Sequence, residues 1–535
     1  MSPKLPLSEL IRPFVVNRPD ETMLFDRGLE VSWGEFDALC LRTVNWLRGQ
    51  GVGPADRVAV WLVNRVEWLA LLFGLARVGA TMVAVNTRYR AAELEYILQR
   101  SGAKLLVLQL NFKKIDFPLV LRDVNPASAQ ALVRVAVVDA DASMPARILG
   151  RPTVAFEPGA QAGAEAQDGS DPEAVALMIS TSGTTRGPKL AMHVQWRLTL
   201  HSQQLARAAA LDAPGARLLA MTPFCGVGGF NPVLGALAGG ATVHVMDAFD
   251  AAAAAHTMLQ QGITHAFGLD VMLRGIVDQV PGHDPFPAAR RLHYICLNDP
   301  AGFLPFAHAA AARRIPLLPI TYGSSEMQGM FALPRCDRPM PEMVQAPGWP
   351  ISGASDAVRI CDPDSGAILG PGHSGTLEIR SITGFVGYFD NEEATREAMT
   401  PDGYFRTGDI ASQLADGSFA YESRLGDSLR LGGFLVSPVE IEEVLKALPG
   451  VAEAQVVGVS VDGVYRCAAF IVSSPLGAPT EAEVVAWAAA RLAPFKVPAR
   501  VWSVSEFPVT EGPNGVKVQR GKLRDMAQVR LATGA

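Results

Sequence analysis

The sequence predicts an α/β protein in which a large N-terminal domain of mostly parallel sheets flanked by helices precedes a small α+β domain. Between residues 34 and 110, helix-like and strand-like segments alternate along the chain. Near residue 424 the pattern changes to paired strand-like runs with separate helices. The 535 residues are enough for more than one core. We therefore expect an N-terminal domain over 1–423 and a C-terminal domain over 424–535.

The first elements are predicted from apolar spacing. Phe36, Cys40, Val44 and Leu47 recur at helical intervals, whereas short continuous apolar runs are typical of buried strands. Such alternation predicts βαβ units with crossover helices and a parallel sheet. The expected helices are 36–47, 66–78 and 91–100, and the expected strands are 57–62, 81–85 and 104–108.

The middle of the chain continues this pattern. We expect strands over 174–179 and 242–246 and helices in the alanine-rich tracts 251–255 and 309–312. The stretch 218–246 has no acidic or basic side chain apart from His244, but repeated glycines and prolines interrupt it. A strand, a loop and a helix buried in a globular core are therefore expected there, and not a membrane span.

The last hundred residues predict the small α+β domain. Ser437 and Pro438 form a helix start signal, with the serine as N-cap and the proline at the first position. Strand-like runs follow at 453–459, 466–472 and 501–504, and a helix is expected at 481–492.

Composition excludes some classes of partner and compartment. Lys and Arg total 47 against 53 Asp and Glu, a net charge of −6 that does not favour nucleic acid as a partner. The cysteines lack CxxC spacing and are expected to be buried thiols in a reducing compartment. Residues 1–13 lack an apolar signal core, so a cytoplasmic location is expected. The sequence leaves the oligomeric state open, a homodimer included. The six cysteines are Cys40, Cys225, Cys296, Cys336, Cys361 and Cys467.

The segment 181–189, Thr-Ser-Gly-Thr-Thr-Arg-Gly-Pro-Lys, is the strongest chemical signal. It follows an apolar strand, so it lies at a carboxyl end, where open α/β sheets bind ligands. Glycines and small hydroxyl residues let a backbone wrap around phosphate oxygens, and Lys189 adds a positive charge. Lys189 follows Pro188 and precedes Leu190, which excludes the GK[ST] form of a nucleotide P-loop.

This loop resembles the phosphate loop of the adenylate-forming superfamily, which includes acyl- and aryl-CoA synthetases. Further segments resemble motifs of that superfamily in the same order, and together they cover nearly the whole chain. They are Tyr-Gly-Ser-Ser-Glu at 322–326, Gly-Tyr at 387–388, Gly-Tyr-Phe-Arg-Thr-Gly-Asp at 403–409, the hinge motif at 424–427, Leu-Gly-Gly-Phe-Leu-Val-Ser-Pro at 431–438 and Asn-Gly-Val-Lys at 514–517.

The resemblance implies a role for each motif. Tyr322 would pack on adenine, Asp409 and Arg424 would bind the ribose, and Glu326 with Thr184 would hold Mg²⁺. Lys517 would contact the carboxylate and the α-phosphate, so Lys517, Glu326 and Thr184 are the candidate catalytic residues. The candidate nucleotide-binding residues are Thr181, Ser182, Gly183, Thr184, Thr185, Lys189, Tyr322, Gly323, Ser324, Ser325, Asp409 and Arg424.

The remaining expectations concern the acid and the thiol. By position, Phe224, Cys225, Gly226 and Gly229 should line the acyl pocket. These apolar or small residues favour a fatty or other hydrophobic acid, with an aliphatic acid slightly ahead of an aromatic one. The superfamily members that activate amino acids keep an aspartate in this segment to pair with the ammonium group, and its absence here disfavours amino acids. The resemblance implies that the two glycines at 432–433 would approach the pantetheine arm of CoA. The candidate CoA-binding residues are Gly432 and Gly433.

The resemblance thus implies a ligase that uses ATP, Mg²⁺ and CoA. A carboxylic acid forms acyl-AMP with release of pyrophosphate, and a mobile C-terminal domain then rotates about 424–427 so that CoA can attack. Other functions stay open: an enzyme that loads a carrier protein, an aryl-CoA ligase, a luciferase-like monooxygenase, and a catalytically silent binding relative. Arg186, Leu190 and Gly426 depart from the superfamily pattern, and Val516 adds one residue before Lys517.

Overall fold

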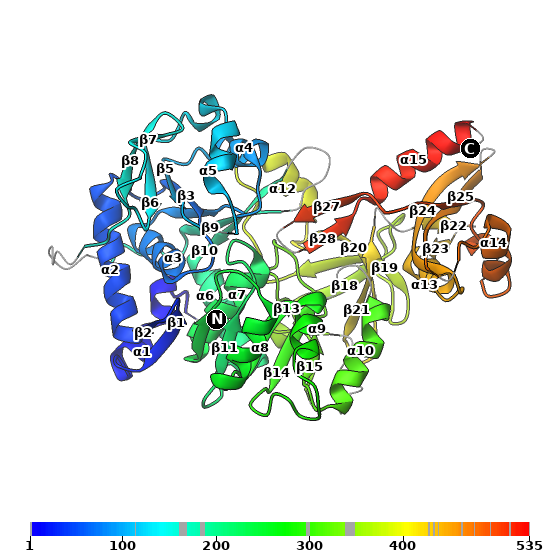
Figure 1. Ribbon diagram of the computed structural model, residues 1–535, viewed down its shortest axis with the longest axis horizontal. Coiled ribbons are helices and arrows are strands. Elements are labelled where there is room, and N and C mark those ends of the chain that lie inside the picture. The colour runs from blue at the N-terminus through cyan, green and yellow to red at the C-terminus, as the bar shows by residue number, and fades with distance from the viewer. Residues whose placement is uncertain are drawn as a thin grey trace. The chain divides into compact units, whose positions relative to one another are not determined.

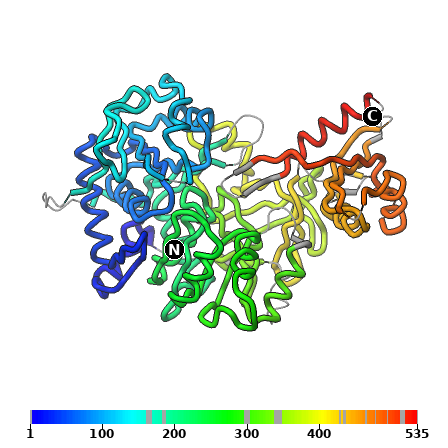
Figure 2. The backbone as a smooth tube through the Cα atoms, in the orientation of Figure 1, coloured from blue at the N-terminus to red at the C-terminus, as the bar shows by residue number. Residues whose placement is uncertain are grey.

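The computed structural model describes residues 3–112, 114–159, 168–181, 188–295, 300–336, 348–425, 429–431, 434–436, 438–461, 464–475, 477–492, 494–512 and 515–533. The chain forms two compact units. The first comprises Met1–Cys296, Phe303–Asp356 and Ser381–Glu397, and the second comprises Leu297–Gly302, Ala357–Arg380 and Ala398–Ala535. Figure 2 shows the course of the chain by colour from the N-terminus to the C-terminus.

The first unit contains an eight-stranded sheet. All neighbouring strands are parallel except β10 with β9 and β7 with β8. In spatial order the strands are β10 (Leu190–Val194), β9 (Val175–Ser180), β4 (Thr81–Ala84), β3 (Arg57–Trp61), β5 (Leu105–Gln109), β6 (Arg134–Val138), β8 (Arg151–Ala155) and β7 (Arg147–Ile148).

A seven-stranded sheet forms the other half of this unit, and only its edge pair, β1 with β2, is antiparallel. In order its strands are β15 (Leu317–Pro319), β14 (Arg291–Ile295), β13 (His265–Leu269), β11 (Arg217–Ala220), β12 (Thr242–Val245), β1 (Thr22–Asp26) and β2 (Leu29–Ser32). A short antiparallel pair, β16 (Ala332–Leu333) with β17 (Trp349–Pro350), follows.

Helices pack beside both sheets (Figure 1). The helices are α1 (Arg12–Asn17), α2 (Trp33–Gly49), α3 (Val66–Val78), α4 (Ala91–Ser101), α5 (Phe117–Asp123), α6 (Gln195–Ala208), α7 (Val227–Gly239), α8 (Ala251–Gln260), α9 (Asp270–Asp278), α10 (Pro300–Ala312) and α12 (Glu392–Ala398), with short 3₁₀ turns at Leu7–Leu10, Pro126–Ala129 and Gly353–Ser355.

The period of two in β3 divides the core of the first unit. Val58 and Val60 contribute to a cluster that also takes in α2, α3, α6 and α7, whereas Ala59 and Trp61 contribute to a second cluster with α4 and α5. The strand is therefore buried on both faces, as expected for a parallel sheet covered by helices. A third cluster packs α8, α9 and α10 with strands of the seven-stranded sheet.

The second unit combines mainly antiparallel sheets with helices, and among its described strands only β26 pairs in parallel, with β25. Its strands are β18 (Ala357–Cys361), β19 (Ser374–Arg380), β20 (Phe405–Gln413) and β21 (Phe419–Arg424) in one sheet, the hairpin β22 (Leu429–Leu431) with β23 (Phe434–Val436), the sheet β24 (Val451–Val461), β25 (Val464–Ser473) and β26 (Val501–Ser503), and the hairpin β27 (Val509–Gly512) with β28 (Gly515–Val518). The helices are α13 (Pro438–Lys446), α14 (Glu481–Ala489) and α15 (Arg520–Thr533), with a 3₁₀ turn at Pro494–Lys496.

The elements agree with the sequence predictions. The apolar stretch 218–246 becomes β11, α7 and β12 inside the core, and no described helix is long and apolar enough to cross a membrane. One expectation was wrong: Cys336 is exposed, because it lies in a turn after β16, whereas Cys40, Cys225, Cys361 and Cys467 are buried. Cys296 and the expected N-cap Ser437 lie outside the described residues. The domain boundary at 424 and the hinge over 424–427 stay predictions.

Candidate functional site

The phosphate-loop candidate connects β9 to the antiparallel strand β10. At its base the amide of Thr181 donates to the carbonyl oxygen of Lys189 at 2.8 Å, so the two ends of the loop are joined by a backbone hydrogen bond. The ammonium of Lys189 lies 4.8 Å from the centre of the Tyr388 ring. Ser182, Gly183, Thr184 and Thr185 lie outside the described residues.

The surroundings of Leu190 explain why this residue departs from the superfamily pattern. Its side chain is buried in the second core cluster beside Met178. Its carbonyl accepts from the amide of Phe389 at 2.8 Å, and the amide of Met192 donates to Gly387 at 3.0 Å. A large apolar residue therefore fits at 190, where β10 is paired on both sides. Arg186 and Gly426, the other departures, lie outside the described residues.

The Tyr-Gly-Ser-Ser-Glu segment forms a tight turn after β15. Tyr322 is buried and pairs with Ala332 as an isolated bridge. A Cβ at Gly323 would lie 1.3 Å from the carbonyl oxygen of Gly329, so the turn excludes every larger residue. The carbonyl of Ser324 accepts from the amide of Gly329 at 2.8 Å, which closes the turn.

A buried histidine supports this turn. Nε2 of His193, in β10, lies 3.0 Å from the carbonyl oxygen of Ser325 and donates to it, because a carbonyl can only accept. Burial lowers the pKa of His193 to about 4, so the ring is neutral at pH 7. The strand that follows the phosphate loop thus holds the turn that contains Glu326.

Glu326 meets the same tyrosine as Lys189. The Tyr388 hydroxyl donates to Oε1 of Glu326 at 2.8 Å, and the amide of Phe385 donates to the Glu326 carbonyl at 2.7 Å. The structure therefore brings together Lys189 and Glu326, which the sequence places in separate motifs. Tyr388, noted only as part of a motif, is the residue that joins them.

The candidate acyl-pocket residues lie where β11 leads into α7. Phe224 and Cys225 are buried in the core, and the Phe224 ring packs edge-on against Trp68 with centroids 5.6 Å apart. Gly226 precedes the first residue of α7. A Cβ at Gly229 would lie 2.0 Å from the carbonyl oxygen of Pro223, so this helix starts in close contact with the segment before it.

Two asparagines from the eight-stranded sheet hold this segment of the seven-stranded sheet. After β3, Asn64 donates from Nδ2 to the carbonyl of Thr222 at 2.8 Å and accepts at Oδ1 from the amide of Phe224 at 2.7 Å. After β4, Oδ1 of Asn86 accepts from Sγ of Cys225 at 3.8 Å. Carboxyl ends of strands from both sheets therefore meet at residues 222–225, as the switch-point rule for ligand sites expects.

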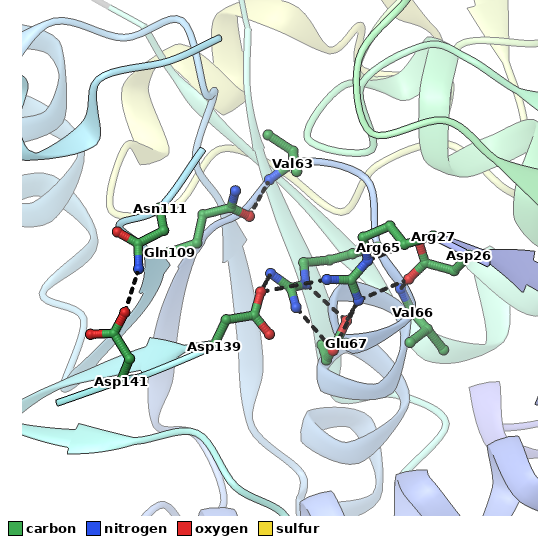
Figure 3. Close-up of polar contacts among 10 residues, drawn as sticks. All are labelled: Asp26, Arg27, Val63, Arg65, Val66, Glu67, Gln109, Asn111, Asp139 and Asp141. Atoms are coloured by element: carbon green, nitrogen blue, oxygen red, sulfur yellow. Dashed lines mark hydrogen bonds and ion pairs between the residues drawn. The ribbon is translucent and has the colours of Figure 1, made fainter. Parts of the chain in front are cut away.

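An ion-pair network fixes the backbone next to Asn64 (Figure 3). Arg65 is 2% exposed and contacts Glu67 with two nitrogens, at 2.8 and 3.0 Å, and Asp139 at 2.8 Å. Burial alone would lower the pKa of Arg65, but its bonds to Glu67 and Asp139 raise that pKa above its usual value. Arg27 also contacts Glu67 at 3.1 Å, and Asp26 accepts from the amide of Val66 at 2.9 Å. The start of α3 is thereby anchored to β1 and to the end of β6.

In the second unit, Asp409 and Arg424 are direct partners. They oppose each other in the pairing of β20 with β21, and Nη1 of Arg424 lies 3.0 Å from Oδ1 of Asp409. The same Nη1 donates to the carbonyl of Thr407 at 3.0 Å, and Thr407 Oγ1 accepts from the amide of Asp409 at 3.0 Å. The two candidate ribose-binding residues thus form one unit of structure.

The remaining candidates lie in the C-terminal part. Gly432 and Gly433 lie outside the described residues. Lys517 belongs to β28, where it pairs with Thr510 of β27, and its side chain is outside the description.

Sequence reasoning missed Asn64, Arg65 and Asn86, and it named Tyr388 only as part of a motif, without its contacts. A signal for the first three was present: polar residues directly after two buried parallel strands lie at the ligand-binding edge of a sheet.

Comparison with known proteins identifies the family. A family model described as "AMP-binding enzyme" matches residues 12–389, and one described as "AMP-binding enzyme C-terminal domain" matches residues 440–512. The chain belongs to the AMP-binding enzyme family. The resemblance to adenylate-forming enzymes, of the acyl-CoA ligase type, is confirmed.

Curated relatives extend over nearly the whole chain. A 3-hydroxybenzoate–CoA/4-hydroxybenzoate–CoA ligase of Thauera aromatica is 31% identical over 97% of this chain and 96% of its own. The putative acyl-CoA synthetase YngI of Bacillus subtilis is 27% identical over 95% and 94%. The long-chain-fatty-acid–CoA ligase FadD13 of Mycobacterium tuberculosis is 28% identical over 93% of each chain. The AMP-binding protein described here thus has relatives named for both aromatic and fatty acids.

Solved structures agree in fold. The crystal structure of ATP-bound MatB from Rhodopseudomonas palustris matches with a TM-score of 0.80 at 24% identity, covering 98% of this chain and 99% of that one. The anthranilate CoA ligase AuaEII in complex with anthranoyl-AMP matches with a TM-score of 0.78 at 23% identity, over 99% and 98%. The predicted α/β architecture, with a larger N-terminal and a smaller C-terminal part, is confirmed.

Proposed function

We propose that this AMP-binding enzyme joins a hydrophobic carboxylic acid to CoA at the expense of ATP, through an acyl-AMP intermediate. The observation that carries the proposal is the convergence of Lys189 and Glu326 on Tyr388 within a chain of this family. A cation for triphosphate oxygens and a carboxylate for their metal ion are the two charges that adenylate formation requires side by side.

In the first half-reaction a carboxylate oxygen of the acid attacks the α-phosphorus of ATP. The new P–O bond forms as the bond to pyrophosphate breaks, and pyrophosphate leaves with the electron pair. Lys189 and the loop after Thr181 offset the charge of the triphosphate, while Lys517 contacts the carboxylate and the α-phosphate. Asp409 and Arg424 bind the ribose, and Tyr322 packs against the adenine.

Glu326 suits a magnesium ion whose other ligands are phosphate oxygens and water. Among the described residues no group of three or more His, Cys, Asp or Glu side chains could hold a metal ion. A single carboxylate is the usual protein contribution to such an ion, which supplies Lewis-acid stabilisation of the triphosphate when bound. Thr184 is the second proposed ligand.

In the second half-reaction the CoA thiol, after loss of its proton to solvent, attacks the acyl carbon, and AMP leaves with the electrons of the acyl–phosphate bond. Rotation about 424–427 withdraws Lys517 and presents Gly432 and Gly433 to the pantetheine arm. One site then serves both steps, because the hinge exchanges the groups that face the substrate.

The acid is proposed to be hydrophobic because Phe224, Cys225, Gly226 and Gly229 carry no charge. A fatty acid is the first candidate. An aromatic or cyclic acid is the second, favoured by relatives named as ligases of hydroxybenzoate and of a bicyclic propanoate at 30–31% identity.

A pyrophosphate-release screen tests the proposal. Purified protein is supplied with ATP, Mg²⁺ and a panel of aliphatic and aromatic acids, with and without CoA. Acid-dependent pyrophosphate together with a CoA thioester supports the ligase. Transfer to a phosphopantetheine carrier protein but never to CoA supports carrier loading instead, and no acid-dependent AMP with any acid overturns the proposal.

A further inference from the structure

Tyr388 makes two different contacts with the proposed nucleotide site. Its ring lies under the ammonium of Lys189, with 4.8 Å between the nitrogen and the ring centre. Its hydroxyl donates to Oε1 of Glu326 at 2.8 Å. One side chain therefore contacts a cation through its face and an anion through its edge.

The backbone holds Tyr388 firmly in this place. The residue is 7% exposed and forms an isolated antiparallel bridge with Ala191, two residues after Lys189. Its amide donates to Oγ1 of Thr395 at 2.9 Å. The neighbouring Phe385 amide also fixes the Glu326 carbonyl, so the segment 385–388 is tied to both motifs.

Within the part of the chain that the structure describes, Lys189 and Glu326 form no direct ion pair, although both contact Tyr388. A lysine and a glutamate in direct contact would neutralise each other and offer less charge to a ligand. Because each contacts Tyr388 and not the other, Lys189 keeps its charge available to an anion and Glu326 keeps carboxylate lone pairs available to a cation.

We propose that Tyr388 is a positioning residue that separates and orients Lys189 and Glu326, so that one receives triphosphate oxygens and the other receives the metal ion bound to them. This inference rests on the proposed function for the identity of the ligands.

Two substitutions separate the contacts. Tyr388→Phe keeps the ring under Lys189 and removes the hydrogen bond to Glu326. Binding of ATP with Mg²⁺, measured by calorimetry, is expected to weaken about tenfold, the effect of losing a hydrogen bond to a charged group, while ATP binding in excess EDTA is unchanged. Tyr388→Leu removes the ring as well, so metal-free ATP binding is also expected to fall, about threefold.

The matched control is Tyr96→Phe. Tyr96 is half-buried in the same unit, and no hydrogen bond of its hydroxyl is recorded with any described residue. This variant is expected to bind ATP like the wild type under both conditions. If Tyr388→Leu fails to fold, Tyr388→Phe alone tests whether ATP binding in the presence of Mg²⁺ depends on the hydrogen bond to Glu326.

Mn²⁺ binding followed by electron paramagnetic resonance, in the presence of ATP, gives a readout that a merely structural role would not move. If Tyr388 acts through the carboxylate, Tyr388→Phe weakens Mn²⁺ binding in the wild-type background but adds nothing to Glu326→Gln. Additive effects, or equal weakening with and without metal, would overturn the assignment. These binding measurements need no acid, so they stand even if the pyrophosphate screen fails.

Discussion

At the scale of single residues, the site depends on close backbone approach and on buried polar side chains. Gly323 has no room for a Cβ beside Gly329, and His193 holds the carbonyl of Ser325 from the neighbouring strand. His201, in α6, is also buried, and its Nδ1 lies 3.4 Å from Oγ1 of Thr383. Each of these contacts leads to a measurable expectation.

Gly323→Ala is expected to destabilise the protein by about 1–3 kcal/mol, or more, because the added carbon overlaps the carbonyl oxygen of Gly329 and the turn must move. Urea unfolding measures the change. Gly228→Ala is the control, because a Cβ there meets nothing within 4 Å and the residue lies in α7, where alanine is preferred to glycine. Equal stability of the two variants would contradict the geometry of the turn.

Stability is expected to fall in acid through His193 and His201. Burial, and then repulsion from His193, lowers the pKa of His201 to about 3, whereas an unfolded histidine titrates near 6.5. The unfolded chain therefore binds more protons below about pH 6.5. The stability that the neutral ring retains above that pH is lost progressively as the pH falls toward 3, by up to about 1.4 kcal/mol per pH unit.

His201→Leu should make the decline of the melting temperature between pH 7 and pH 5.5 shallower, as followed by scanning calorimetry. His283→Leu, at an exposed position, serves as the control and should retain the wild-type slope. A slope that is the same in all three proteins would mean that His201 is not protonated on unfolding in this range.

At the scale of elements, the site forms where strands of two sheets end. The end of β3 supplies Asn64, the end of β4 supplies Asn86, and both reach the segment between β11 and α7. The network of Arg65, Glu67 and Asp139 fixes the start of α3 beside Asn64. The position of the proposed acyl-pocket wall therefore depends on an element from the other sheet.

Asn64→Asp is expected to raise the Michaelis constant for the acid and to leave that for ATP within about twofold. The aspartate can still accept from the amide of Phe224, but it cannot donate to the half-buried carbonyl of Thr222, and the lost hydrogen bond costs about 1 kcal/mol. Steady-state kinetics with each substrate varied in turn separate the two constants. Equal increases for acid and ATP would count against a local role in the pocket wall.

At the scale of the whole molecule, the proposed function requires two half-reactions that use different parts of the chain. Lys517 lies in the β27–β28 hairpin, and Asp409 with Arg424 lies in the antiparallel sheet of the second unit. Most elements could be predicted from sequence, because apolar periodicity decides which segments are helices and which are strands. The Tyr388 contacts could not, because they join β10, the turn after β15 and a loop near 388, and no local pattern encodes which of these segments meet.

Lys517→Ala is expected to reduce acid-dependent pyrophosphate release about 10²–10³-fold, because a charge contact to the developing transition state is lost. Formation of the CoA thioester from supplied acyl-AMP should change little, because in the proposed mechanism that step follows the withdrawal of Lys517. Lys522→Ala, in α15, is the control for removing a nearby positive charge. Equal loss in both half-reactions would argue against a lysine used in adenylation alone.

The hydrogen bonds from Asn64 to the segment after β11 have a consequence for the evolution of substrate preference. The amide holds only main-chain atoms of Thr222 and Phe224, so it does not depend on which side chains those positions carry. Relatives could therefore exchange the residues that face an acid while the anchor stays the same. Substitutions at 222 and 224 that preserve the packing against Trp68 should accordingly leave the anchor in place and can alter acid selectivity, whereas substitutions at 64 should remove the anchor.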